Sequence, residues 1–395
     1  MRYKVHRGSH EIGGNCIELI SRGKSLLLDI GTPLSDVNPD ISYVHGKYDA
    51  VIISHSHADH YGLMNMIDKN IPIYIGELSF QLIEALSYFT NYEIPENKFI
   101  LFKPWKDFII EGTNFTIHPF LMDHSSPEAF AFLISDDEEK LFYTGDFRAT
   151  GAKKIVLENL EKHPPKDVKK LIIEGTNLNR QAGNYITEDD IKLAFQKIFI
   201  TQTNISFVIG SSQNIDRIIC AYKAARDAKK TLVMDFYTYW ILNLVSQKSD
   251  AIKAVLPDIM VLRKGSISGS QYNKMMMHKE IFDEFARTIF RNNQTLTEED
   301  LINNPAAFVF YGRLTHFSLI KKFQLHDLNL IYSQWNGYLT DRVKKNPYGA
   351  DEINTLKTQT NFIEIHTSGH AYKDDLQRME AIFPGAELIR VHTEF

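Results

Sequence analysis

The segment HSHADH at residues 55–60 holds four side chains that could bind metal ions. Imidazole nitrogens and carboxylate oxygens are donors that zinc takes in proteins. His55 and His57 lie two residues apart, so in an extended segment their side chains point the same way. Asp59 and His60 follow where the chain is expected to turn into a helix, which would aim them at a second ion. A His-rich polar surface loop is the alternative, but only 15 of the 395 residues are histidine.

Two metal ions need more ligands than one loop can supply, and later segments offer them. The apolar run YDAVIIS directly precedes the HSHADH loop and predicts a buried strand. His124 in MDHSSPEAF and Asp146 in FYTGDFR also follow apolar runs. Either residue alone would be read as a structural histidine or a turn-forming aspartate. Their order behind the HSHADH loop is what favours a metal site.

The elements that must position these residues change character along the chain. Short apolar runs such as CIELI, SLLLDIG and IPIYIG predict strands in the first half, with helices between them. From about residue 189, longer helical patterns alternate with short strands, which predicts a second α/β domain with a parallel sheet. One of these helices is expected over YWILNLVSQKSDAIKAVL, residues 239–256. The final stretch returns to strand, helix and strand.

Length and composition narrow the class of protein. A chain of 395 residues exceeds the size of one hydrophobic core, so two domains are expected. Cys16 and Cys220 are the only cysteines, which excludes a disulfide framework and a Cys-based zinc site. We expect a cytoplasmic protein without membrane contact, because no signal peptide or apolar run of spanning length occurs. The net charge of −5 argues mildly against bulk attraction to nucleic acid, but leaves room for a local basic channel.

In the order of these motifs the chain resembles the metallo-β-lactamase superfamily. Asp29 in LLLDIG matches the first motif of that superfamily and would support the site structurally. The HSHADH loop matches the second motif, His124 the third and Asp146 the fourth.

The later motifs resemble those of the β-CASP group within that superfamily. LIIEGTN, HTSGHA and RVHTEF are similar to its motifs A, B and C, and they place Glu174, His370 and His392 at the motif positions. GSSQNIDRI resembles the segment that opens the inserted domain of RNase J-like enzymes. Motif C reads HTE where the group often has HGE. Because the chain stops three residues after His392, we expect the C-terminal domain of RNase J to be absent.

This resemblance implies an α/β fold, an αββα metallo-β-lactamase sandwich with an inserted α/β β-CASP domain. The first part of the metallo-β-lactamase domain is predicted over 1–189, the β-CASP domain over 190–350 and the return segment over 351–395. The resemblance is to RNase J and to the cleavage-and-polyadenylation endonuclease. It implies two divalent ions, Zn²⁺ or Mn²⁺.

The resemblance also implies a role for each site residue. One ion would be held by His55, His57 and His124, the other by Asp59, His60 and His392, and Asp146 would bridge them. His370 would act as general acid, oriented by Glu174, because imidazole titrates in the useful range. Asp59 could also serve as a base toward the attacking water.

Two short segments are predicted to bind phosphate groups. Ser211, Ser212 and Asn214 lie between a strand and a helix, where backbone N–H groups favour an anion, although an ordinary helix N-cap explains them equally well. The second group, which flanks His370, is Ser368, Gly369 and Ala371. Basic candidates for the RNA path are Arg148, Lys153, Lys154, Arg217, Arg313, Lys321 and Lys322.

The predicted function is hydrolysis of RNA phosphodiester bonds by an RNase J-like exonuclease or endonuclease. His392 favours RNA, since DNA-processing members of the group often carry Val at that position. The alternatives are a DNA nuclease of the same group, a hydrolase of small esters or thioesters, and a catalytically silent scaffold. A specialised role such as phage defence, and a homo-oligomeric state, stay open.

Overall fold

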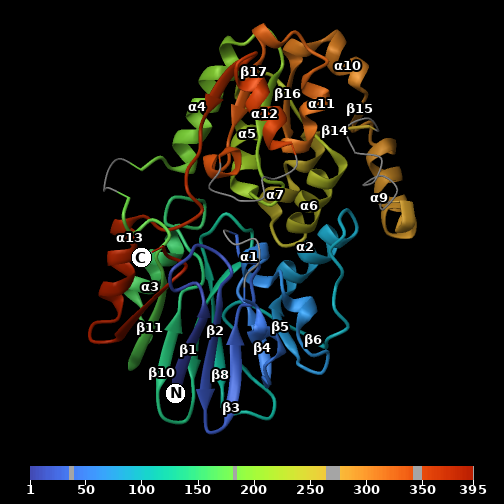
Figure 1. Ribbon diagram of the computed structural model, residues 1–395. Coiled ribbons are helices and arrows are strands. Elements are labelled where there is room, and N and C mark those ends of the chain that lie inside the picture. The colour runs from blue at the N-terminus through green and yellow to red at the C-terminus, as the bar shows by residue number, and fades with distance from the viewer. Residues whose placement is uncertain (35–39, 181–184, 264–275, 341–348, 395) are drawn as a thin grey trace. The chain divides into compact units, whose positions relative to one another are not determined.

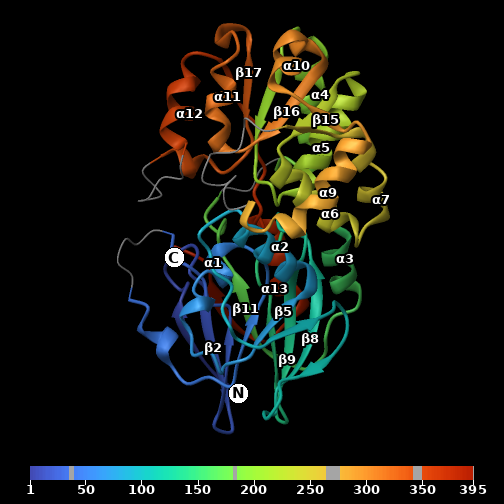
Figure 2. The ribbon, with the colours of Figure 1, turned by 90° about the vertical axis from the view of Figure 1, so that its right-hand side faces the viewer.

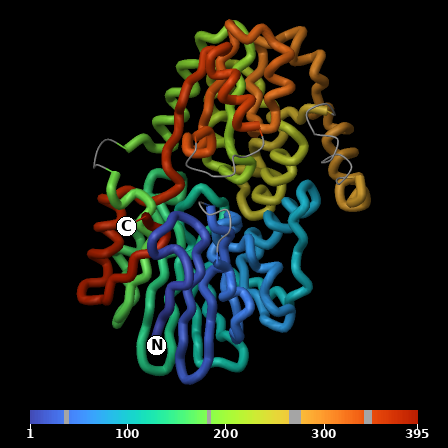
Figure 3. The backbone as a smooth tube through the Cα atoms, viewed as in Figure 1, coloured from blue at the N-terminus to red at the C-terminus, as the bar shows by residue number. Residues whose placement is uncertain are grey.

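The protein divides into two compact units. The computed structural model describes residues 1–34, 40–180, 185–263, 276–340 and 349–394. The first unit comprises 1–83, 93–185 and the segment from 368 onward, and the second comprises 84–92 and 186–367. The two marked chain ends therefore belong to the first unit (Figure 3). None of the described helices is long and apolar enough to cross a membrane.

The first unit contains two six-stranded sheets, drawn in the lower part of Figure 1. One sheet has the order β1-β2-β3-β4-β5-β6, in which β1 to β3 are antiparallel neighbours and β3 to β6 run parallel. Its strands are β1 Arg2–Arg7, β2 Cys16–Ser21, β3 Lys24–Leu28, β4 Ala50–Ile53, β5 Ile73–Gly76 and β6 Phe99–Phe102. The helices that follow β4 and β5 are α1 Ala58–Tyr61 and α2 Glu77–Ser87.

The other sheet has the order β19-β11-β10-β9-β8-β7. Its strands are β7 Phe108–Ile109, β8 Thr116–Met122, β9 Ala129–Ser135, β10 Lys140–Tyr143, β11 Val168–Glu174 and β19 Glu387–Val391. Helices α3 Ile155–Lys162 and α13 Lys373–Ile382 pack together and contact β8 and β11 respectively (Figure 2). The last strand, β19, pairs in parallel with β11, so a segment from the end of the chain completes this sheet.

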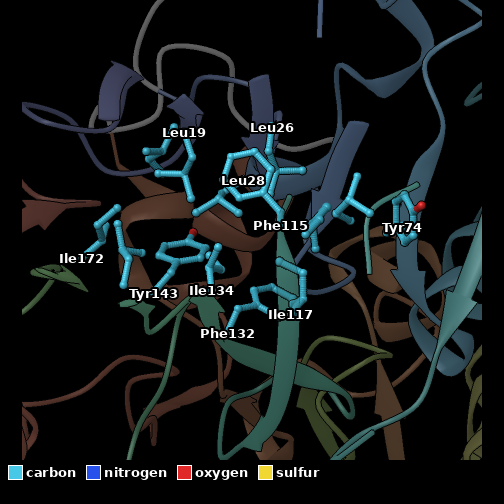
Figure 4. Packing of buried hydrophobic residues seen from close by; sticks show 14 of the residues in the cluster. Leu19, Leu26, Leu28, Tyr74, Phe115, Ile117, Phe132, Ile134, Tyr143 and Ile172 are labelled. Carbon is cyan, nitrogen blue, oxygen red and sulfur yellow. The ribbon is translucent and has the colours of Figure 1, made fainter. Parts of the chain in front are cut away.

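A hydrophobic core joins the two sheets, and Figure 4 shows part of it. Leu26 and Leu28 from β3 contribute to the same buried cluster as Phe132 and Ile134 from β9. Each pair is two residues apart, as expected where alternate side chains of a strand face one side. Neighbouring side chains of β10 likewise face opposite sides of the sheet. Tyr143 lies in the core between the two sheets, and Phe142 lies in the cluster with residues of α3 and α13.

The second unit contains a seven-stranded sheet whose strands all run parallel. Its order is β15-β14-β13-β16-β12-β17-β18. The strands are β12 Ser206–Ile209, β13 Thr231–Met234, β14 Met260–Leu262, β15 Thr295–Leu296, β16 Phe308–Gly312, β17 Asn329–Tyr332 and β18 Asn361–Glu364. The α/β sandwich with an inserted α/β unit, predicted from the sequence, is therefore confirmed.

The second unit also holds helices α4 Glu188–Thr201, α5 Ile215–Asp227, α6 Phe236–Ser246, α7 Asp250–Lys253, α9 Lys279–Arg291, α10 Glu298–Asn303, α11 Phe317–Ile320 and α12 Ala350–Lys357. The single helix expected over 239–256 is wrong. Helix α6 ends at Ser246, and Ser249 starts α7 by accepting a hydrogen bond from the N–H of Ile252. A serine at this position favours a new N-terminus over a continued helix.

The chain returns to the first unit later than the sequence pattern indicated. Residues 351–367 were assigned to the return segment, but helix α12 and strand β18 belong to the second unit. Strand β18 pairs with β17 along its length, from Asn329 opposite Asn361 to Tyr332 opposite Glu364. The second unit therefore ends at residue 367, and the first unit resumes at 368.

Candidate metal centre

The HSHADH loop is held in place by backbone hydrogen bonds at the end of β4. Helix α1 has only four residues, so most of its carbonyl groups need partners outside the helix. The N–H groups of Asn15, Ile30 and Thr32 donate to the carbonyls of residues 59, 60 and 58, at 3.1, 2.8 and 2.9 Å. A side chain at Gly31 would place its Cβ 1.6 Å from the Asp59 carbonyl oxygen, so only glycine permits this approach.

The side chains of the predicted metal ligands converge in the first unit. Three groups have ligand atoms within 4.8 Å of one another: His55, His57 and His124; Asp59, His60 and His392; and His55, His60 and Asp146. A fourth group joins Asp146 and His392 to Glu174 and His370. The structure thus brings together nine residues drawn from six separate segments of the chain.

Asp146 lies at the centre of this cluster. Its Oδ2 atom is 3.1 Å from His60 Nε2, 3.8 Å from His392 Nε2 and 3.9 Å from His55 Nε2. On either side, His57 Nδ1 lies 3.0 Å from His124 Nε2, and His392 Nε2 lies 3.2 Å from Asp59 Oδ2. Gly145 has a left-handed φ of 53°, and a Cβ there would lie 2.5 Å from the Phe130 carbonyl oxygen.

The other ring nitrogen of each buried histidine is held by a neighbouring group. His60 Nδ1 donates to Asp29 Oδ2 at 2.8 Å, and Asp29 also accepts from the Ser54 N–H and from the Tyr143 hydroxyl. His124 Nδ1 donates to the Gly369 carbonyl at 2.5 Å. His55 Nδ1 lies 3.0 Å from the Ser54 hydroxyl. These contacts fix the orientation of the rings and leave Nε2 pointing inward.

Burial and neighbouring charge set the protonation of these histidines in the chain without ions. Burial lowers the pKa of His55 and His124 well below the usual value, and lowers that of His57 to about 4. These three rings are therefore neutral, the form in which imidazole binds a metal. Burial alone would also lower the pKa of His60, but the carboxylates of Asp146 and Asp29 outweigh it and raise the pKa.

Two buried polar atoms of the cluster also fit a role in binding metal ions. His55 Nε2 and Asp146 Oδ1 are buried atoms for which the described residues provide no hydrogen-bond partner. Unpaired polar atoms in a buried site are costly, and they are ordinarily paired with protein, water or an ion. Both atoms belong to the cluster of neutral imidazoles and carboxylates, which is the donor chemistry of zinc and manganese sites.

His370 lies beside the metal cluster with a carboxylate behind it. His370 Nδ1 is 3.1 Å from Glu174 Oε2 and 3.5 Å from Asp146 Oδ2. Burial lowers the pKa of His370, but the charges of Glu174 and Asp146 outweigh this and raise it to about 9. Its side chain keeps 21% of its surface exposed, whereas that of His392 is fully buried. His370 is therefore protonated near neutral pH and can be reached from solvent.

The turn at 368–371 is held by Asn177, which the sequence analysis did not single out, and by Ser368. Asn177 Nδ2 donates to the Ser368 hydroxyl and to the carbonyls of His370 and Ala371, at 3.0 to 3.2 Å. The Ser368 hydroxyl also accepts from the His370 N–H. The polar groups of this turn therefore position His370 itself. Asn177 is the last residue of the motif LIIEGTN. Its partners are about 190 residues away in the sequence, so the motif alone does not reveal them.

The residues predicted to bind phosphate in the second unit also make internal contacts. The Ser212 hydroxyl is 2.8 Å from the hydroxyl of Thr238, and the Asn214 side chain caps α5 by accepting from the Arg217 N–H. Ser211 is exposed. Of the basic candidates for the RNA path, Arg148 and Arg217 are wrong, because both are buried.

Each of these two arginines serves a buried ion pair. Arg148 pairs with Asp123 at 3.5 Å and donates to the carbonyl of Ser368. Arg217 makes two hydrogen bonds to the carboxylate of Glu188, at 2.9 and 3.0 Å.

Part of the sequence matches the profile of a known protein family. The sequence profile of the β-lactamase superfamily domain matches residues 35–182, which include the HSHADH loop, His124 and Asp146. Residues 35–182 are therefore similar to the β-lactamase superfamily domain. The profile ends at residue 182, so it does not cover residues 186–367 of the second unit.

The curated proteins similar to this chain include several named ribonuclease J. Ribonuclease J 1 of Streptococcus pyogenes is 30% identical over 161 residues, which are 36% of this chain and 27% of that protein. Ribonuclease J of Helicobacter pylori is 26% identical over 235 residues, which are 53% of this chain and 33% of that protein. The chain therefore spans about a third or less of these curated relatives.

A solved structure resembles the whole chain. The crystal structure of a protein of unknown function from Enterococcus faecalis V583 superposes with a TM-score of 0.73 and covers 99% of this chain and 94% of its own. Its sequence is 17% identical, so the likeness concerns the fold alone. The fold of this chain thus also occurs in another protein.

Proposed function

We propose that this chain is a metal-dependent ribonuclease of the β-CASP type that hydrolyses RNA phosphodiester bonds. The observation that carries the proposal is the position of Asp146, whose Oδ2 atom faces histidines of both predicted ligand groups. A shared carboxylate between two sets of imidazoles is the arrangement that a pair of divalent ions requires. The similarity to proteins named ribonuclease J supports RNA as the substrate.

The first ion would be held by His55, His57 and His124, the second by Asp59, His60 and His392, and Asp146 would reach both. Zn²⁺ suits these imidazoles best, and Mn²⁺ is the alternative. Two such ions, when bound, make a water molecule more acidic and neutralise charge that develops on phosphate oxygens.

The remaining side chains of the site supply proton chemistry and orientation. His370 would donate a proton to the leaving oxygen, because its imidazole lies beside the cluster, is partly exposed and has Glu174 behind it. Glu174 would hold the ring through Nδ1, and its other oxygen, Oε1, accepts from the Phe147 N–H at 2.9 Å. Asp59, besides binding the second ion, could accept a proton from the attacking water.

In this proposal, two groups of residues contact the phosphates of the RNA. Ser211 is exposed at the end of β12, and with Ser212 and Asn214 it would meet the phosphate backbone. Ser368, Gly369 and Ala371 would form the second phosphate contact, next to His370. His392, at the motif position where DNA-processing members often carry Val, favours RNA over DNA.

Cleavage of matched nucleic acids tests the proposal. Purified chain with Zn²⁺ or Mn²⁺ is expected to cleave 5′-monophosphorylated RNA and to lose this activity with a chelator, while DNA of the same sequence stays intact. Circular RNA separates the two modes, since only an endonuclease opens it. Activity on DNA alone, or on small esters alone, would overturn the assignment.

The Asp146→Asn variant tests whether RNA cleavage depends on the proposed metal site. Loss of the carboxylate charge should reduce cleavage by a factor of about 100 or more and lower the number of ions bound. Asp137→Asn is the matched control, because Asp137 pairs with Arg22 on the surface. Retention of full activity in Asp146→Asn would show that the reaction occurs elsewhere.

A further inference from the structure

The hydroxyl of Thr176 lies between the rings of His370 and His392. Its Oγ1 atom is 2.7 Å from His392 Nδ1 and 3.2 Å from His370 Nδ1. The two rings are stacked with centroids 5.0 Å apart. Thr176 follows β11, whereas His392 follows β19, and the parallel pairing of these strands brings the hydroxyl to the ring. Thr176 is thus the one hydroxyl described as touching both histidines.

The ring of His392 has only two nitrogens, and both have assigned partners. Nδ1 faces Thr176 and Nε2 faces Asp59 Oδ2 at 3.2 Å. To bind a cation, Nε2 must offer its lone pair, so the ring proton must lie on Nδ1. The Nδ1–H group then needs an acceptor, because the His392 side chain is fully buried. Thr176 Oγ1 is the acceptor within hydrogen-bond distance.

The hydroxyl can accept this proton without losing its own hydrogen bond. Its O–H group can donate to the carbonyl oxygen of His392, which is 3.3 Å away. The second lone pair of Oγ1 faces His370 Nδ1, whose N–H is shared with Glu174 Oε2 at 3.1 Å. All donors and acceptors of the group are then satisfied.

We infer that Thr176 is a positioning residue that fixes the tautomer of His392 and so prepares Nε2 for the second ion. The inference rests on the proposed function, because it assumes an ion at Asp59, His60 and His392. It adds a residue that acts through its hydroxyl oxygen and does not itself bind the ion. The three histidines of the first ion, His55, His57 and His124, do not touch Thr176 in any described contact, so their ion should be unaffected.

Zinc binding by variants tests this inference directly. Wild type, Thr176→Val, Thr176→Ala and Thr176→Ser are dialysed against buffered free Zn²⁺, and bound metal is measured by mass spectrometry. Val and Ala should weaken the second ion by about 10- to 100-fold and leave the first unchanged, which is the usual effect of removing a hydrogen-bond partner of a ligand. Ser should restore wild-type binding, because it keeps the hydroxyl.

Thr150→Val is the matched control, since Thr150 is buried and its hydroxyl has no described partner. Circular dichroism and melting of the metal-free chains establish that each variant is folded, and Ala provides a hydroxyl-free variant where Val fails to fold. Second-ion affinity equal to wild type in Val or Ala would overturn the inference alone. A wild-type chain that binds fewer than two ions would overturn the proposed metal centre, and the inference with it.

Discussion

At the scale of single residues, two non-glycine residues of the site have a left-handed backbone conformation. Asp29 has φ of 59° and His392 has φ of 52°. Such conformations are uncommon outside glycine and cost of order 1–3 kcal/mol each, so the surrounding contacts must hold them. Asp29 is held by hydrogen bonds from Ser54, His60 and Tyr143. His392 is held by the contact between its Nδ1 atom and the Thr176 hydroxyl.

His370→Ala should separate proton donation from metal binding. Without the imidazole, the leaving oxygen has no donor, so cleavage should slow by about 10²- to 10⁴-fold. The bound metal, measured in the same preparation, should stay at the wild-type value, because His370 is not among the proposed ligands. His326→Ala serves as control, since that side chain is 76% exposed. Loss of metal together with activity would instead assign His370 to an ion.

Asp235 predicts an acid-sensitive contribution to the stability of the second unit. Burial alone would raise the pKa of this carboxyl, but the Arg313 guanidinium and His316 outweigh it and hold the pKa below the usual 3.8. A lowered pKa in the folded state stabilises the protein above the unfolded value. This stability is lost as pH falls below about 3.8 and toward the lower folded value.

Urea unfolding at pH 7 and pH 3 measures this effect. Asp235→Asn should lose about 3 kcal/mol at pH 7, since it leaves Arg313 without its charge partner, and should lose less than wild type on acidification. Asp137→Asn, on the surface, should follow wild type. An equal pH dependence in wild type and Asp235→Asn would contradict the assignment.

The convergence of the proposed ligands could be predicted from sequence, but the hydroxyls beside them could not. Four donors in six residues after a strand are improbable by chance, and the order of later motifs supplied the rest. Ser54, Tyr143 and Thr176 are common residue types with no distinctive spacing. Thr176 and His392 are 216 residues apart, so their contact depends on strand pairing that local patterns do not encode.

At the scale of elements, helix α1 is held by the loop beside it. Gly31→Ala would place a methyl group against the Asp59 carbonyl, which must move to make room. We expect destabilisation by about 3 kcal/mol or more, with loss of metal binding, because Asp59 and His60 are part of α1. Thermal unfolding and bound zinc measure both effects.

Gly23→Asn is the control for this substitution. Gly23 has a left-handed φ of 76°, which asparagine tolerates, and a Cβ there meets nothing within 4 Å. A Gly31→Ala protein as stable as wild type would show that the carbonyl contact is not a constraint.

Element types were easier to predict than element boundaries. The run YDAVIIS was expected to form a strand, and β4 covers Ala50–Ile53. The break between α6 and α7 was missed although residues 246–250, SQKSD, are all polar. Strand β18 was assigned to the wrong unit, since an apolar run shows that a strand exists but does not show which neighbour it pairs with.

At the scale of the whole molecule, the metal centre should contribute to the stability of the first unit. Its ligands come from both sides of the inserted unit, so bound ions would favour the folded state over the unfolded chain. Free Zn²⁺ at 100 times its dissociation constant should stabilise by about 2.7 kcal/mol per site, and chelation should remove this.

Calorimetry with and without chelator measures the stabilisation. The Asp146→Asn variant should respond much less, because it lacks the shared carboxylate. A melting temperature that zinc raises equally in both proteins would place the ion elsewhere on the chain.

The return of the chain through β19 has a consequence for protein synthesis. His370 and His392 are translated only after the entire insertion, and β11 cannot acquire its outer neighbour until then. A ribosome-bound intermediate therefore carries the HSHADH loop without His392, the last proposed ligand of the second ion, and without His370, the proposed proton donor. The proposed nuclease activity of each nascent chain would arise only once its final strand has been made.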